Sequence, residues 1–306
     1  MGSVKQIDQV NFGLVLASFA VAHIAPIELL VLFYAFVGPA HYLTEMAWLH
    51  ERQYFTKARW DYLLLAPLGL LVFASFDLGL QYIVLIVVFF LAISMALTGN
   101  WIVRAIVTAA FSALALALIV LETPMSWFFV LLPNLIHIVV FTSIFIFVGA
   151  MRNNSVYGFA TLGALVVCGA SFFLPINLNI SATAYGLENL PLIHAMYDGL
   201  FDLFQVDFDD SFSRNLIGFI AFVNTYHYLN WFSKTEVIKW HLVPRPILLT
   251  VCAIYAVSIG IYAYDFALGF KVLLLLSFLH VVMEFPLNTI STLEAGRLVK
   301  QRFRAV

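Results

Sequence analysis

Long apolar stretches separated by short polar turns make up most of the chain. Ten stretches emerge when the sequence is cut at its polar and proline-containing turns, and most are close to the roughly 20 residues that one membrane crossing requires. They are 11–24, 27–50, 60–76, 79–99, 101–121, 125–151, 157–177, 212–233, 246–264 and 268–292. This pattern predicts an all-α polytopic transmembrane bundle of about ten spans, or eight or nine if the first or third stretch is re-entrant.

Positive charges orient these spans. With the N-terminus in the cytoplasm, all but two of the fifteen lysines and arginines lie at inner ends or in inner loops, and the exceptions are Arg214 and Lys271. The segment 178–210 then lies outside, with acidic residues and no lysine or arginine. The positive-inside rule therefore predicts cytoplasmic N- and C-termini in a plasma (inner) membrane. Apolar residues at helical spacing over 191–204 predict an interfacial helix in this acidic outer segment.

Composition narrows the function classes. Residues of hydrophobic type make up 63% of the chain and charged residues only 10%, whereas soluble domains carry about 25% charged residues. A net charge of −2 excludes the basic footprint of a nucleic-acid-binding protein. With 306 residues, ten spans leave no room for a separate soluble domain, so we expect 1–306 to form one integral-membrane domain.

Two of the predicted spans carry a histidine followed four residues later by a glutamate. These pairs are His41 with Glu45, and His280 with Glu284. A spacing of four places both side chains of a pair on one helix face. Ionisable groups at membrane depth cost a few kcal/mol or more, so they face a protein interior and mark functional sites.

Two further spans contribute one deep histidine each, His137 and His227. In the predicted topology all four histidine-bearing spans run from outside to inside. Their histidines then lie at compatible depths, which allows one cluster inside the bundle.

Imidazoles and carboxylates in this combination are ligands of non-haem iron with positions left open for oxygen, and zinc accepts the same donors. The expected metal ligands are His41, His137, His227, His280, Glu45 and Glu284. The expected catalytic side chains are Glu45, Glu284 and Tyr228, with Asn230 lining the site. Other uses remain open: a proton relay in a transporter, bis-histidine haem ligation, or structural polar contacts between helices.

Other polar and aromatic groups have simpler interpretations. An outer group borders water, so we expect its side chains to be solvated; the alternative is a lid over an outer opening. Its members are His23, Glu28, His194, Asp198 and Asp202. Tryptophans and tyrosines near the predicted span ends are typical of interfacial anchors. These are Tyr54, Trp60, Trp101, Trp231 and Trp240.

The stretch Gly38-Pro39-Ala40-His41-Tyr42-Leu43-Thr44-Glu45 resembles the Gly-x-Pro-His-Gly-x-x-Asp signature of the Brp/Blh family of membrane β-carotene 15,15′-dioxygenases. His227 and the His280-x-x-x-Glu284 motif look like counterparts of that family's other intramembrane histidine motifs. The proline is one residue further from the histidine, Tyr42 replaces glycine, and Glu45 replaces aspartate. These departures from the signature affect, first of all, which substrate the resemblance implies.

The resemblance implies histidine-bound iron, dioxygen as co-substrate and an apolar, polyene-like substrate entering from the bilayer. Together with the residues above, it leads us to expect a membrane-embedded, iron-dependent oxygenase or related oxidoreductase acting on a lipid-soluble, carotenoid-like molecule. The competing hypothesis is a proton-coupled transporter that uses the His–Glu pairs as a relay.

Overall fold

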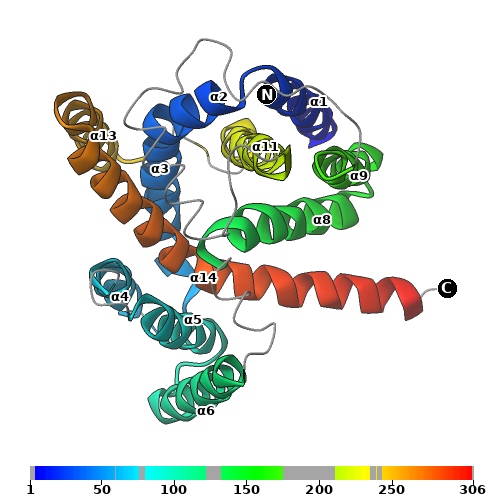
Figure 1. The fold of residues 1–306 in the computed structure, drawn as a ribbon. Helices are drawn as coiled ribbons and strands as arrows, with labels where there is room; N and C mark the ends of the chain where they lie inside the picture. Colours follow the sequence, from blue (N-terminus) through cyan, green and yellow to red (C-terminus); the bar gives the residue numbers. More distant parts are fainter. Residues whose placement is uncertain are drawn as a thin grey trace. The chain divides into compact units, whose positions relative to one another are not determined.

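The structure is a computed structural model that describes residues 4–58, 60–75, 80–121, 132–174, 211–234, 239 and 243–304. Every regular element within these ranges is a helix, as predicted (Figure 1). The elements are α1 (Val4–Ile24), α2 (Pro26–Leu32), η1 (Phe33–Val37), α3 (Gly38–His50), η2 (Gln53–Phe55), α4 (Tyr62–Ala74), α5 (Gln81–Leu97), α6 (Trp101–Val120), η3 (Leu132–Phe141), α8 (Thr142–Asn153), α9 (Val156–Ser171), α11 (Ser211–Ser233), α13 (Arg245–Tyr264) and α14 (Phe266–Arg304). Each predicted apolar stretch overlaps at least one of them. The acidic segment 178–210 and its predicted interfacial helix lie outside the described residues.

Six helical segments of the described residues are long and apolar enough to cross a membrane. They are Lys5–Ile24, Pro26–His50, Trp101–Val120, Leu135–Asn153, Arg245–Tyr264 and Leu268–Arg304. Shorter apolar helices cover Tyr62–Ala74, Tyr82–Leu97 and Val156–Ser171. Large apolar side chains such as Leu249 and Val257 on α13 are mostly exposed, which is unfavourable in water and normal in lipid. These features indicate a membrane protein.

The chain divides into two compact units, each assembled from separate stretches of sequence. The first comprises Met1–His41, Gly149–Val243 and Ala256–Phe270. The second comprises Tyr42–Val148, Pro244–Tyr255 and Lys271–Val306. The division passes through α3, so that His41 belongs to the first unit and Tyr42 to the second.

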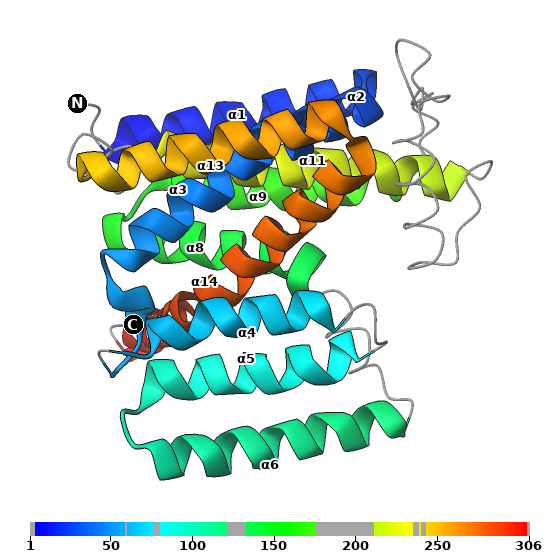
Figure 2. The same ribbon diagram turned by 90° about the vertical axis from the view of Figure 1, so that its left-hand side faces the viewer.

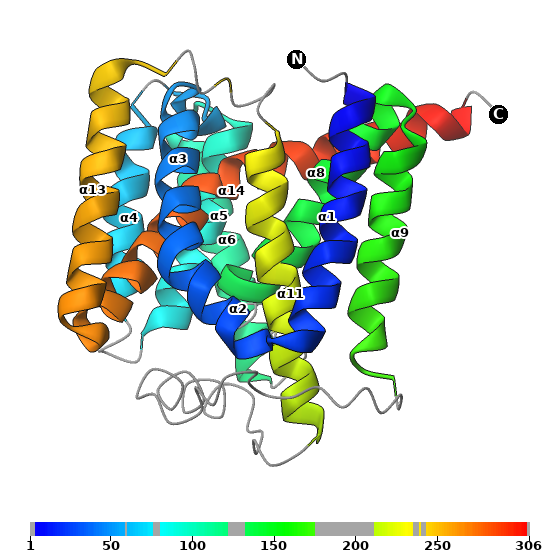
Figure 3. The same cartoon turned by 90° about the horizontal axis from the view of Figure 1, so that it is seen from above.

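In the first unit, α1 packs against both α9 and α11, and α11 also contacts α2 and η1 (Figure 3). The α9 and α11 ends meet closely at Gly218, where a Cβ atom would lie 2.8 Å from Cε1 of Phe172. A polar contact joins α1 to α11, because the amide of Asn11 donates to the Ser233 hydroxyl at 2.9 Å.

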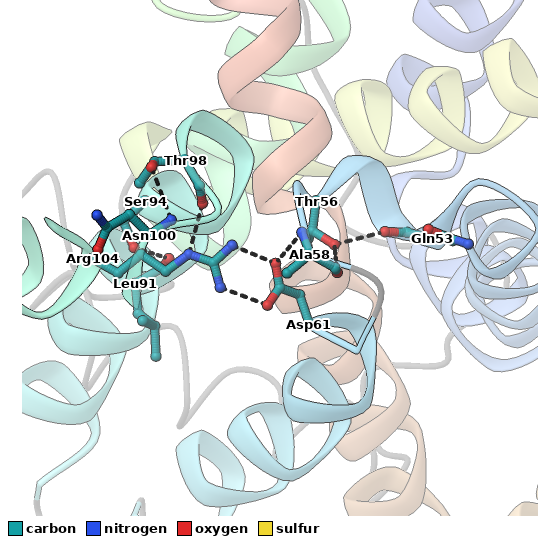
Figure 4. A network of polar contacts seen from close by, with 9 residues as sticks. All are labelled: Gln53, Thr56, Ala58, Asp61, Leu91, Ser94, Thr98, Asn100 and Arg104. Atoms are coloured by element: carbon teal, nitrogen blue, oxygen red, sulfur yellow. Dashed lines mark hydrogen bonds and ion pairs between the residues drawn. The ribbon is translucent and has the colours of Figure 1, made fainter. Parts of the chain in front are cut away.

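In the second unit, α4, α5 and α6 lie side by side in chain order (Figure 2). Their buried apolar residues form one core with α14, including Leu65, Ile86 and Phe285. At one end of these helices, Arg104 forms two hydrogen bonds of 2.6 Å to Asp61 and a third of 2.7 Å to the carbonyl of Thr98 (Figure 4). This buried ion pair ties the start of α6 to the start of α4.

The backbone leaves regular α-helical geometry beside two prolines. Phe33–Val37 forms a π-helical turn immediately before Pro39, whose missing N–H removes one helical hydrogen bond. A second π-helical segment, η3, contains Pro133 and His137. π-Helical turns are frequent at functional sites, and here one precedes His41 and the other carries His137.

Helix α14 extends well beyond the predicted end of its apolar stretch at 292. It runs for 39 residues to Arg304 and continues through Pro286. The prediction placed the end where apolar residues stop, but hydropathy reports the surroundings of a helix and not its hydrogen bonding. Charged residues past 292 therefore continue the same helix.

Candidate metal-binding histidine pairs

His41 and His227 form a buried pair in the first unit. The Nε2 atoms of the two rings lie 3.0 Å apart, and the rings are nearly perpendicular, at 81°. His41 comes from the first turn of α3 and His227 from α11. Both residues are buried, with 1% and 7% of the residue exposed.

Aromatic rings surround this pair. His41 contacts Tyr228 and Trp231 of α11, with ring centroids 5.0 and 5.7 Å away. Phe33 of the π-helical turn stacks on Tyr228 in parallel, at 6.5 Å. Trp231, expected at the membrane interface as an anchor, thus packs against a site histidine.

His137 and His280 form a second pair in the second unit, with almost the same geometry. Their Nε2 atoms lie 3.2 Å apart, and the ring planes make an angle of 78°. His137 comes from the π-helical segment η3, and His280 from the middle of α14. Each of these residues is only 2% exposed.

The second pair has an acidic and an aromatic neighbour. Nδ1 of His137 lies 3.0 Å from Oε2 of Glu284, one turn after His280 on α14. Tyr42 of α3 stacks on the other ring, with centroids 4.3 Å apart and planes 19° from parallel. The second unit therefore joins a carboxylate, two imidazoles and a phenol ring in a closed environment.

The two Nε2–Nε2 separations suit two kinds of contact. One ring can donate its Nε2 proton to the other, as a direct hydrogen bond between neutral imidazoles. Alternatively, two nitrogen ligands at about 2.0–2.1 Å from one metal, subtending about 90–110°, lie about 2.9–3.4 Å apart. Both observed separations fall inside that interval. Each pair thus fits two neighbouring corners of a metal's coordination sphere.

The other predicted site residues are buried as well. Glu45 is 2% exposed on α3, one turn after His41, and Asn230 is 5% exposed on α11. Glu45 and Glu284 belong to the second unit, whereas Tyr228 and Asn230 belong to the first.

Two further buried residues, Tyr42 and Asn288, lie next to predicted site residues in space or along a helix face but were not predicted from the sequence. Asn288 continues the face of α14 that carries His280 and Glu284, with the same spacing of four residues. It is 2% exposed, and no described residue bonds its side-chain amide. The spacing of four residues from Glu284 to Asn288 is present in the sequence. An uncharged amide, however, is a weaker signal of a membrane-buried site than a histidine or a glutamate. The stacking of Tyr42 on His280 depends on tertiary structure and had no sequence signal.

The outer polar group is described only in part. Nδ1 of His23 lies 2.9 Å from the carbonyl oxygen of Phe19, and its ring stacks on Phe172 at 4.4 Å. These contacts give His23 a packing role within the first unit. His194, Asp198 and Asp202 lie outside the described residues.

No protein-family model, curated protein or solved structure matches the chain. The resemblance to the Brp/Blh family accordingly stays a hypothesis based on three short motifs.

Proposed function

We propose that this protein is a membrane-embedded, metal-dependent oxygenase, with non-haem iron as the metal and a lipid-soluble, carotenoid-like molecule as substrate. The observation that supports this most is the repeated histidine geometry. Two pairs, one in each unit, hold their Nε2 atoms at 3.0 and 3.2 Å in nearly perpendicular rings. Burying four imidazoles in a membrane protein costs free energy, so such residues usually serve a function.

In this proposal the four histidines are the metal ligands, and the carboxylates set their protonation. The carboxylate of Glu284, whose Oε2 lies 3.0 Å from Nδ1 of His137, favours a proton on that nitrogen by its charge, which leaves the Nε2 lone pair of the ring for the metal. Glu45 is a carboxylate ligand or plays the same orienting role on α3. Tyr228, beside His41, is a hydrogen-bond donor for a substrate or oxygen atom near the site.

The reaction proposed is cleavage of a carbon–carbon double bond by dioxygen. Each carbon of that bond receives one oxygen atom, so that two carbonyl groups form and no external reductant is consumed. Iron, when bound, supplies the redox chemistry that allows dioxygen to react with the alkene. The chain's own residues bind and orient the reactants, and their burial excludes water from the site.

A second candidate function, proton-coupled transport, is favoured by one contact. Buried His137 and Glu284 lie 3.0 Å apart, and such histidine–carboxylate chains carry protons in transporters. The two proposals differ in what they require of the Nε2 atoms. A metal needs their lone pairs, whereas a relay needs a proton on one of them.

We further propose ten spans, both termini in the cytoplasm and a location in the plasma (inner) membrane. The charge asymmetry of the loops supports this orientation. The experiment on function uses the purified full chain in lipid nanodiscs, loaded with ferrous iron and supplied with ¹⁸O₂ and polyenes such as β-carotene. The proposal predicts labelled carbonyl products that disappear in His280→Ala. No oxygen uptake with any polyene, together with proton flux in liposomes, would instead assign the protein to transport.

A further inference from the structure

A pocket that contains charged side chains lies in the first unit, and neither histidine of that unit's pair lines it. It has a volume of about 580 Å³ and is lined by the start of α1 and the turn between α8 and α9. The lining residues are Lys5, Asp8, Asn153, Asn154, Ser155, Val156 and Tyr157. Its volume lies within the range of about 300–1,000 Å³ that is usual for small-molecule sites. Figure 3 shows the starts of α1 and α9 beside one another.

The pocket lies at the ends of two candidate membrane spans. Lys5 is the first residue of one such span, and Asn153 is the last residue of another. Helix ends of this kind meet the headgroup region of a bilayer, because the apolar part of each span fills the hydrocarbon layer. A phospholipid headgroup is therefore the ligand that is most abundant at this depth.

The two charged residues of the pocket have opposite signs and do not neutralise each other. Lys5 and Asp8 are one turn apart on α1, yet no ion pair joins either of them to a described residue. Oδ2 of Asp8 is buried and has no hydrogen-bond partner within the described ranges. A buried carboxylate oxygen without a donor is costly, so this atom points to a cationic ligand that donates hydrogen bonds.

Donors for an anion lie in the same pocket. Lys5 supplies an ammonium group, and Val156 and Tyr157, which also line the pocket, are the first two residues of α9. The Ser155 hydroxyl accepts the N–H of Gly158 at 3.1 Å, whereas the N–H groups of the two preceding residues have no acceptor within the helix. A phosphate fits beside Lys5 at this helix start.

We propose that this pocket binds the headgroup of an ethanolamine phospholipid, with its phosphate at Lys5 and its ammonium group at Asp8. A choline headgroup has no N–H group that could donate a hydrogen bond to Asp8. It would instead need aromatic rings around its quaternary ammonium, and Tyr157 is the only aromatic residue that lines the pocket. A glycerol headgroup carries a net negative charge and no cation to pair with Asp8. The chemistry of the pocket thus distinguishes three common headgroups.

The test is native mass spectrometry of the purified full chain with equal amounts of phosphatidylethanolamine, phosphatidylcholine and phosphatidylglycerol of the same acyl chains. We expect retention of phosphatidylethanolamine over the other two by about fivefold, the range of a partly exposed ion pair. Asp8→Asn should abolish that preference while phosphate-dependent retention persists. Lys5→Ala should lower the retention of all three lipids.

Two control variants remove one carboxylate and one ammonium group outside the pocket. Asp265→Asn, in the same unit outside the pocket, and Lys300→Ala, at an exposed position near the end of α14, should leave the lipid preference unchanged. Thermal unfolding of every variant verifies its fold. Equal retention of the three lipids by the unmodified chain, or an unchanged preference in Asp8→Asn, would overturn the proposal. Soluble phosphoethanolamine bound in place of the lipid would overturn the assignment to a membrane ligand.

Discussion

Nδ1 of His137 lies 3.0 Å from a carboxylate oxygen of Glu284, while Nε2 of the same ring faces His280 at 3.2 Å. The two edges of the His137 ring thus have different partners. A carboxylate at Nδ1 favours the tautomer that carries its proton there, and this leaves Nε2 as a lone-pair donor. A carboxylate beside the second ring nitrogen is common among histidines that bind metals.

Glu284→Gln should weaken metal binding while the fold persists. The amide keeps the volume of the glutamate but removes the charge that orients His137. Loss of such an orienting partner typically lowers metal affinity about 10–100-fold. Metal titration of the apo-protein measures the change, and Glu294→Gln on the same helix is the matched control. Unchanged affinity in Glu284→Gln would remove the orienting role from this contact.

Gly69→Ala should destabilise the second unit because α4 lies directly against α14. A Cβ atom at Gly69 would be 2.8 Å from Cδ2 and 3.2 Å from Cα of Leu279, the neighbour of His280. Overpacking of this kind costs about 1–3 kcal/mol. Gly163→Ala is the control, since nothing lies within 4 Å of its added atom, and better helix propensity should stabilise it by up to about 1 kcal/mol. Thermal unfolding in detergent gives both values, and equal shifts would contradict the close helix contact.

Asp61→Asn should be among the most destabilising single substitutions outside the histidine pairs. It leaves the guanidinium of Arg104 buried without its carboxylate, and breaking a buried ion pair costs about 3–5 kcal/mol. Arg297→Lys provides the comparison, because its 3.8 Å contact with Glu294 is exposed and worth at most about 1 kcal/mol. Similar unfolding free energies for the two variants would show that water reaches the Asp61–Arg104 pair.

Alkaline pH should destabilise the fold through Tyr54 in η2. Burial, and to a smaller extent the charge of neighbouring Tyr62, raises the pKa of Tyr54 to about 12. An unfolded tyrosine ionises near pH 10, so between about pH 10 and 12 the unfolded chain loses this proton and the folded chain keeps it. Stability therefore falls through that window, by at most about 3 kcal/mol from this group. Tyr54→Phe should flatten this part of the pH profile; an identical profile would contradict the burial of the phenol.

The helices were largely predictable from the sequence, because apolar stretches bounded by polar residues specify membrane helices directly. The start of α2 at Pro26 and the irregular backbone before Pro39 follow from the chemistry of proline. Helix α14 was predicted too short, since polar residues after 292 end an apolar stretch without ending a helix. The Asp61–Arg104 pair was missed because Arg104 was counted as an inner-end charge.

The site was predictable as a set of residue types but not as contacts. Deep histidines and glutamates stand out in a chain with so little charge, and spacing of four residues links them along each helix. The partner of each histidine on another helix depends on packing. The pairing of His41 with His227, and of His137 with His280, therefore required the structure.

The metal content of the purified full chain decides whether the histidine pairs bind iron. A non-haem iron oxygenase should hold about one or two equivalents of iron per chain. This iron should be lost in His41→Ala and in His280→Ala, and retained in His50→Ala, which removes an exposed histidine of α3. A metal-free chain that takes up no iron or zinc, or full iron content in both site variants, would contradict this prediction.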